Sequence, residues 1–218
     1  MEIIEIIEKA KEIRDELKVN KDFKNNQISK DLPVIKPFIG SDIIKLIIIG
    51  QDPTVKNEKS REKITVTLNL DKQNSLRKYI EFVCKKLGLE IDNVYATNIF
   101  KYFYTYPPAT TMDILFAHLL PNLELLKEEL QSYKDCIIIT LGEPVLQLLI
   151  EDKAKVREFW NYNSKTKITD GKFKICEAKD NKINRDFYPF PHQPSMIKEF
   201  YKNTIEEYIE FVKESKKK

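Results

Sequence analysis

A carboxylate that could take part in hydrolysis follows an apolar run near the start of the chain. In "KLIIIGQDPT", residues 45–54, the run ends at a glycine and continues with Gln51, Asp52, Pro53 and Thr54. Proline removes a backbone donor and fixes its own φ, so the acid before it is held in a set direction. A carboxylate held in this way can orient a water molecule or stabilise a cation. The other interpretation is that Asp52 only forms a turn after a strand.

Two further side chains suit the same kind of chemistry. Asn98 lies near the end of the predicted strand at 93–100, and its amide offers two donors and an acceptor, which match the edge of a nucleobase. His192, one of two histidines, lies in a loop that contains Pro191 and Pro194, and a neutral imidazole there can donate to an oxygen that gains charge. The simpler interpretations are that Asn98 caps a loop and that His192 is structural.

The elements that must position these side chains follow an α/β pattern. Short apolar runs predict strands, and amphipathic stretches between them predict helices. The predicted strands are 42–50, 93–100, 135–142 and 172–178, and the predicted helices cover 1–18, 72–88, 112–133, 143–150 and the last 20 or so residues. This alternation predicts a three-layer α/β/α sandwich around a central four-stranded parallel sheet. Ligands bind such sheets beyond the carboxyl ends of the strands, where Asp52, Asn98 and His192 are expected to meet.

The bulk composition limits the class of protein. With 218 residues, 42% of them hydrophobic, the chain can form one α/β domain, which we place at 41–218 behind an N-terminal helical arm and connection at 1–40. The net charge of +3 does not by itself indicate a nucleic-acid partner. No apolar run is long enough to span a membrane, and three dispersed cysteines predict a reduced, cytoplasmic protein. The oligomeric state stays open, with a monomer as the expectation.

Four stretches together resemble the uracil-DNA glycosylase superfamily, of which the chain looks like a divergent member. "IIIGQDPT" is similar to the first active-site motif, "VYATNIF" to the strand ending in the Asn that reads uracil, and "PHQPS" to the C-terminal His-Pro-Ser motif. The long helix, strand and "LG" turn of residues 119–149 resemble the segment between them. The matches occur in the family's order over roughly residues 43–212.

The resemblance implies roles for individual residues. Asp52 would position the hydrolytic water and favour the sugar cation, and His192 would stabilise negative charge on the departing base. Gln51 and Asn98 would contact the base. The DNA contacts and the wedge that fills the gap left by a flipped base would come from Gly142, Pro194, Ser195 and Met196, with Ile197 as a second candidate for the wedge.

The sequence departs from the family pattern at three places. Thr54 stands where the family has a tyrosine that blocks a thymine methyl group. The stacking phenylalanine should lie in "KITVTLNL", which has no aromatic residue, and Thr67 or Val66 occupies its approximate place as a base contact. An extra Gln193 separates the histidine from Pro-Ser. The iron–sulfur branches need four cysteines, so we expect no metal and no cofactor.

The resemblance therefore implies a DNA glycosylase that hydrolyses the N-glycosidic bond of uracil or a related damaged base, with DNA containing a flipped base as its partner. Two other functions stay open. The missing aromatic and the near-neutral charge favour a catalytically degraded module that binds DNA or a protein. An enzyme acting on free nucleotides would also need no basic track for DNA.

Overall fold

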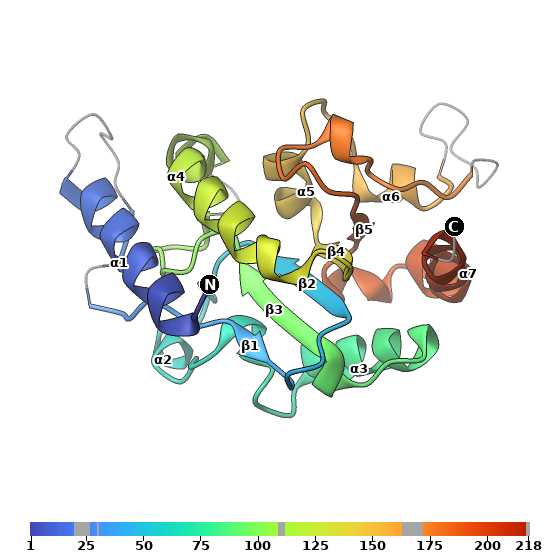
Figure 1. The fold of residues 1–218 in the computed structure, drawn as a ribbon, viewed down its shortest axis with the longest axis horizontal. Coiled ribbons are helices and arrows are strands. Elements are labelled where there is room, and N and C mark those ends of the chain that lie inside the picture. Colours follow the sequence, from blue (N-terminus) through green and yellow to red (C-terminus); the bar gives the residue numbers. More distant parts are fainter. Residues whose placement is uncertain (20–26, 30, 109–111, 163–171, 217–218) are drawn as a thin grey trace.

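The computed structural model describes residues 1–19, 27–29, 31–108, 112–162 and 172–216 (Figure 1). These residues form a five-stranded sheet in the order β1-β3-β2-β4-β5. The strands are β1 (Phe38–Ile39), β2 (Leu46–Gly50), β3 (Val94–Asn98), β4 (Ile137–Leu141) and β5 (Tyr188–Phe190). Strands β3, β2, β4 and β5 run parallel, and β1 pairs antiparallel with β3 at the edge.

The predicted four-strand sheet differs from the structure in two respects. The antiparallel β1 is an additional strand, and it lies in a proline-containing segment that the sequence predicted to be a connection. The fourth parallel strand is Tyr188–Phe190, not residues 172–178. The latter segment forms only isolated antiparallel bridges, from Phe173 to Trp160 and from Cys176 to Phe187. Strand β5 has only three residues and contains a proline, which hides it from a pattern search.

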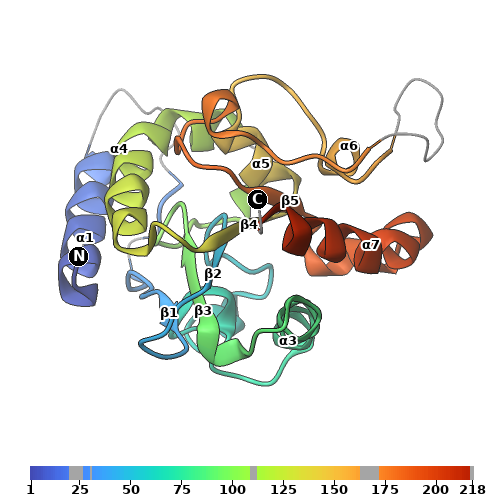
Figure 2. The ribbon, with the colours of Figure 1, turned by 45° about the vertical axis from the view of Figure 1, so that its right-hand side comes forward.

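The central strands have the composition of a sheet that is covered on both faces. Every residue of β2 and β3 is buried. The run of isoleucines in β2 fits this position, because a strand of a parallel sheet contacts helices on both sides. Figures 1 and 2 show α4 (Met112–Leu130) with α1 (Ile3–Val19) on one side of the sheet and α3 (Ser75–Leu87) on the other. The predicted α/β class is therefore confirmed.

Local sequence explains where the helices next to the sheet begin and end. The Asn74 side chain accepts a hydrogen bond from the backbone N–H of Arg77 at the start of α3, and Gly88 ends this helix with a φ of 75°. Pro144 lies in the first turn of α5 (Glu143–Leu149), where its missing N–H costs nothing. The remaining helices are α2 (Glu58–Arg61), α6 (Val156–Phe159) and α7 (Glu199–Ser215), with 3₁₀ turns at 67–69, 91–93, 131–133, 178–180 and 193–197.

The N-terminal helix packs against the domain in the structure. Ala10 and Leu17 of α1 belong to the main hydrophobic core. Lys9 pairs with Glu128 of α4 at 2.7 Å, and the N-terminal amine donates to the Ser132 hydroxyl. Within the described residues, none of the helices combines the length and the apolar character that a membrane crossing requires.

A buried ion pair lies between the sheet edge and α4. Lys101 Nζ is 2.7 Å from Glu129 Oε2, and the two side chains are 1% and 0% exposed. Lys101 Nζ also donates to the backbone oxygen of Asn98, and the Tyr95 hydroxyl donates to Glu129 Oε1. The pair therefore connects the carboxyl end of β3 to the helix that covers it.

Replacing Glu129 with glutamine leaves the buried Lys101 ammonium without its countercharge. Losing one partner of a buried pair costs about 3–5 kcal/mol, so we expect E129Q to lower the free energy of unfolding by this amount in urea titrations. The neighbouring E128Q is a matched control, because Glu128 forms its ion pair with Lys9 at the surface, where such pairs contribute little. Equal effects of the two variants would contradict the prediction.

Candidate functional site

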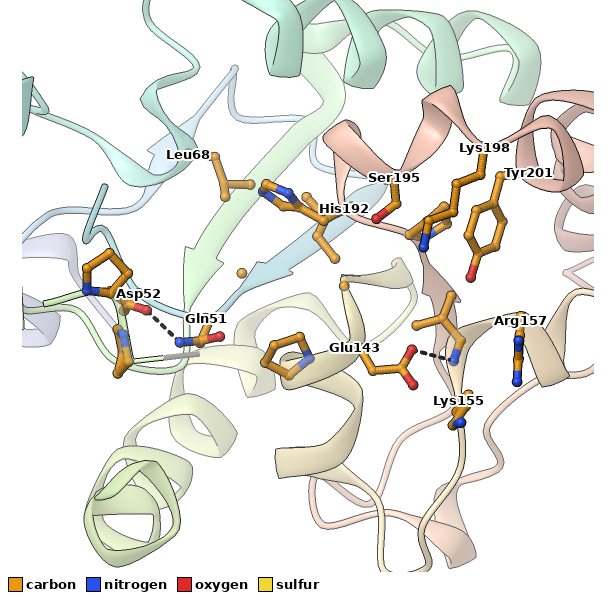
Figure 3. Close-up of a pocket in the computed structure, with 18 of the residues that line it drawn as sticks. Gln51, Asp52, Leu68, Glu143, Lys155, Arg157, His192, Ser195, Lys198 and Tyr201 are labelled. Atoms are coloured by element: carbon orange, nitrogen blue, oxygen red, sulfur yellow. Dashed lines mark hydrogen bonds between the residues drawn. The ribbon is translucent and has the colours of Figure 1, made fainter. Parts of the chain in front are cut away.

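A cavity of about 640 Å³ opens at the carboxyl ends of the parallel strands. Gln51, Asp52 and Thr54 follow β2 in its wall, Gly142 follows β4, and His192 and Ser195 follow β5 (Figure 3). These six residues are among those that the sequence singled out. They meet because parallel strands present their carboxyl ends on the same edge of a sheet.

Asp52 is held at one end of the cavity by two hydrogen bonds. The Gln51 side chain donates from Nε2 to Oδ2 over 2.8 Å, and the Thr54 backbone N–H donates to Oδ1 over 2.7 Å. The second bond spans two residues across Pro53, as in an Asx turn. The carboxylate is therefore fixed in direction.

The loop that carries Asp52 is tied to the segment after β3. The Thr54 hydroxyl accepts from the backbone N–H of Tyr104 over 2.8 Å. Arg61 of α2, although buried, donates to the backbone oxygens of both Val55 and Thr105 at 2.9 Å. One guanidinium thus joins the two loops, because its fixed fork of donors reaches acceptors on both.

Burial raises the pKa of the Asp52 carboxyl to about 6, against the opposing effects of the Thr54 and Gln51 hydrogen bonds and the positive Arg61. Desolvation disfavours the charged form of an acid, which explains the direction of this shift. Near neutral pH the carboxyl is then mainly ionised but basic for its type. A carboxylate in this range suits the acceptance of a proton from water.

His192 lies across the cavity from Asp52, and Gly142 makes room for it. A β-carbon on Gly142 would come within 3.3 Å of His192 Cβ, and the φ of 94° at Gly142 is one that glycine adopts easily. The walls of the cavity desolvate the imidazole and lower its pKa, although the side chain remains more than a third exposed. A neutral ring is the form that can donate one N–H and accept at the other nitrogen.

Asn98 lies behind the cavity wall. Its side chain is buried, and neither Oδ1 nor Nδ2 has a hydrogen-bond partner among the described residues. A β-carbon on Gly50 would lie 2.3 Å from Asn98 Oδ1 and 2.9 Å from Leu68 Cδ2, so the amide is close to two residues that line the cavity. A buried amide without hydrogen-bond partners lowers the stability of the fold, and a ligand that formed hydrogen bonds with it would restore that stability.

Leu68, which sequence reasoning missed, lines the cavity where Thr67 was expected. Thr67 is buried and donates from both its backbone N–H and its hydroxyl to the backbone oxygen of Lys36. The "KITVTLNL" segment, residues 63–70, forms a 3₁₀ turn at 67–69. Within this turn Leu68 has a φ of 57°. A leucine rarely adopts this left-handed conformation, so a strained residue marks this part of the wall. No sequence pattern indicated it.

The loop after His192 divides its residues between two surfaces. Ser195 lines the main cavity, whereas Met196 and Ile197 line a separate groove against Tyr79 and Phe82 of α3. Pro194 is exposed and Met196 is partly buried. Ser195 and the two wedge candidates therefore lie on one turn but face different surfaces.

The far end of the cavity has residues that the sequence did not single out. Glu143, Lys155, Arg157, Lys198 and Tyr201 line it (Figure 3). They come from α5, α6, α7 and the adjoining loops, and no motif joins them in the sequence. Among the described residues, no group of three or more His, Cys, Asp or Glu side chains is arranged to hold a metal ion.

The aromatic segment 100–108 contributes to the core behind the site. Phe100, Tyr102 and Tyr104 are buried in the main core, with ring centroids 5.6–6.3 Å apart. Only the end of the segment reaches the cavity, through Pro107 and Pro108. The aromatic rings therefore support the Asp52 loop from behind.

Asp52→Asn should stabilise the protein at high pH more than at low pH. The folded-state pKa of about 6 exceeds the ordinary 3.8, so the stability that this group contributes is full below pH 3.8 and is lost as the pH rises through 6. Asparagine does not titrate, and the Gln51 amide can turn to pair with it. We expect D52N to gain at most about 2 kcal/mol over the wild type between pH 4.5 and 8, measured by thermal unfolding.

The control for this measurement is D42N, which removes an exposed carboxylate at the opposite edge of the sheet and should show no such gain. An identical effect of D52N at both pH values would show that burial does not set the Asp52 pKa.

Comparison with known families agrees with the geometry of the site. The family described as "Uracil DNA glycosylase superfamily" matches residues 37–214, which include every strand and every residue that lines the cavity. No curated protein matches the chain. Because the match covers most of the chain, the protein belongs to the uracil-DNA glycosylase superfamily.

Proposed function

We propose that this protein is a DNA base-excision glycosylase, which hydrolyses the N-glycosidic bond of uracil or a related damaged base. The observation that carries the proposal is the fixed Asp52 carboxylate, with its raised pKa, in the same cavity as His192. Membership of the superfamily supports a glycosylase-type reaction on DNA. The reaction needs water and placed charges, and the proposal includes no cofactor.

In the proposed reaction Asp52 acts on the sugar side of the bond. As the bond to the base weakens, positive charge develops on the sugar, and an ionised Asp52 favours it electrostatically. The same carboxylate orients the water that attacks the sugar and takes its proton. The hydrogen bonds from Gln51 and Thr54 hold both carboxylate oxygens, so little reorganisation is needed.

His192 acts on the base side. The bond electrons leave with the base, and an oxygen of the base gains negative charge. A neutral imidazole that donates an N–H to this oxygen stabilises it, and the lowered pKa of His192 favours the neutral form. Gly142 supports this role because its missing side chain lets His192 approach the end of β4.

Asn98 is proposed to read the edge of the base. Its two unpaired polar atoms are what a base with adjacent donor and acceptor groups would satisfy. The amide is buried close to Gly50 and Leu68, so the base must displace the Leu68 side chain to reach it. The strained backbone at Leu68 supports such a movement, because leaving the left-handed conformation releases energy.

The surface beside the cavity suits contact with DNA that has a flipped base. Ile197 is 85% exposed on the turn that carries Ser195, which makes it a better wedge than the partly buried Met196. Gly142 and Ser195 remain the proposed phosphate contacts. The proposal includes a three-layer α/β/α domain at 41–218 in a cytoplasmic monomer, and helices on both sides of the sheet support the layers.

Leu68 also favours a second candidate function, a module of glycosylase fold that binds DNA without excising a base. Of the described residues that line the cavity, Tyr201 is the single phenyl or phenol side chain, and it lies at the end away from Asp52. The aliphatic Leu68 side chain in the cavity wall offers less stacking for a base than a ring does.

The test of the proposal is release of free base from single- and double-stranded oligonucleotides that contain uracil, hypoxanthine or a mismatched thymine. We expect release from at least one substrate and a loss of about 100-fold or more in D52N, because a positioned acid or base typically contributes this much. D42N is the matched control and should keep full activity. Absence of release from the whole panel, with binding retained, would favour the binding module.

The rate of release should also depend on pH through Asp52. Protonation removes the charge that the reaction needs, so the rate should fall as the pH drops through about 6. H192Q should react more slowly but keep this acid limb, since the limb belongs to Asp52. A rate that stays constant from pH 5 to pH 8 would contradict the proposed role of the carboxylate.

A further inference from the structure

Three cations from two separate segments line the end of the cavity opposite Asp52. Lys155 precedes α6, Arg157 belongs to α6, and Lys198 lies between the 193–197 turn and α7. In Figure 3 they lie on the side of the cavity away from Gln51 and Asp52. Because Lys198 is distant in the sequence from Lys155 and Arg157, the fold is what brings the two segments together.

The three cations are held in place by neighbouring groups. Glu143 accepts a hydrogen bond from the Val156 backbone N–H over 3.0 Å, which fixes the segment that carries Lys155 and Arg157. The Arg157 guanidinium lies 4.5 Å from the centre of the Tyr162 ring. Lys198 is tied to the His192 loop, because its backbone N–H donates to the Ser195 backbone oxygen over 3.1 Å.

No ion pair within the described part of the chain neutralises their charge. Among the described residues, none of the three forms an ion pair with a carboxylate, whereas several surface lysines elsewhere do. Arg157 Nε is buried and has no hydrogen-bond partner in the described part of the chain. Glu143 is the acidic group in this part of the wall, so the cations exceed the anions there by two.

Tyr201 adds a neutral hydroxyl to the same end of the cavity. Burial raises the pKa of Tyr201 to about 12, with Glu143 raising it further and Arg157 lowering it. The phenol therefore stays protonated and can donate a hydrogen bond. Two ammonium groups, a guanidinium and a phenol form a donor set that suits a phosphate.

The size of the cavity agrees with a ligand larger than a base. A volume of about 640 Å³ lies in the range of pockets that enclose whole drug-sized ligands. A base at the Asp52 end would leave the cationic end unfilled. A nucleotide carries both parts, with its phosphate separated from the base by a sugar.

We propose that Lys155, Arg157 and Lys198 form a phosphate subsite, which binds a phosphate of the nucleotide whose base lies at the Asp52 end. The identity of the base-binding end rests on the proposed function, whereas the phosphate subsite does not require catalysis. The phosphate is either a diester within a nucleic-acid strand or the monoester of a free nucleotide.

The test compares the affinities of deoxyuridine, deoxyuridine 5′-monophosphate, inorganic phosphate and a short uracil-containing oligonucleotide, by calorimetry at fixed ionic strength. All proteins carry D52N so that no ligand is consumed. The test variant K155Q/K198Q loses two exposed lysines of the subsite. The control K45Q/K134Q loses two exposed lysines at the opposite edge of the sheet, so the change in net charge is the same.

We expect at least one phosphate-bearing nucleotide to bind about tenfold or more tightly than deoxyuridine, and this advantage to disappear in K155Q/K198Q but persist in K45Q/K134Q. An advantage of the monophosphate identifies a monoester, and an advantage of the oligonucleotide alone identifies a diester. Equal affinities for deoxyuridine and both phosphate-bearing ligands, or equal losses in the two double variants, would overturn the proposal. So would binding of none of the four ligands.

Failure of this subsite can be distinguished from failure of the proposed reaction. A lysine-dependent phosphate advantage in a protein that releases no base would leave the subsite standing without the glycosylase activity. Release of base without any phosphate advantage would support the glycosylase activity and overturn the phosphate subsite. R157K, which keeps the charge but changes the fork of donors, should weaken phosphate binding less than K155Q/K198Q.

Discussion

The site depends on the parallel register of β2 and β3, which ends with Gly50 opposite Asn98. The absence of a side chain at Gly50 lets the Asn98 amide approach the cavity floor, where a β-carbon would collide with it. Two residues after Gly50 the chain reaches Asp52, so the carboxylate and the amide share one edge of the sheet. A shift of one residue would turn every side chain of the strand to its other face and separate them. The apolar helices on both sides of β2 and β3 hold this register.

The cavity combines two electrostatic environments that a uniform surface could not offer. At one end burial desolvates Asp52, so its carboxyl keeps a raised pKa. At the other end Lys155, Arg157 and Lys198 bring positive charge without carboxylate partners among the described residues. The two ends are suited to different parts of a nucleotide. Glu143 has a structural part in this arrangement, since it holds the α6 segment in place.

Buried polar groups support the site from behind, and they differ in whether their hydrogen bonds are satisfied. Arg61 is satisfied by backbone oxygens, and Lys101 by Glu129 and the Asn98 backbone oxygen, so these groups stabilise the loops that they join. The Asn98 amide is unsatisfied among the described residues. Leu68 beside it has a strained backbone. The unsatisfied Asn98 and the strained Leu68 lie together where a base is proposed to bind. Energetically unfavourable residues of this kind cluster at functional sites in proteins.

The sequence by itself determined the α/β class, three of the four parallel strands and the elements that bring Asp52 and Gly142 to one edge. These follow from hydrophobic runs and glycine or proline positions, which are local properties of the chain. Only the tertiary structure decided the short strand β5 and the cationic end formed by Lys155, Arg157 and Lys198. It also decided that Leu68, and not the expected Thr67, lines the cavity. The physical reason is that β5 is stabilised by pairing with β4, Leu68 is held in its strained turn by its surroundings, and the cations meet only when distant segments pack together. Local patterns carry no record of such contacts.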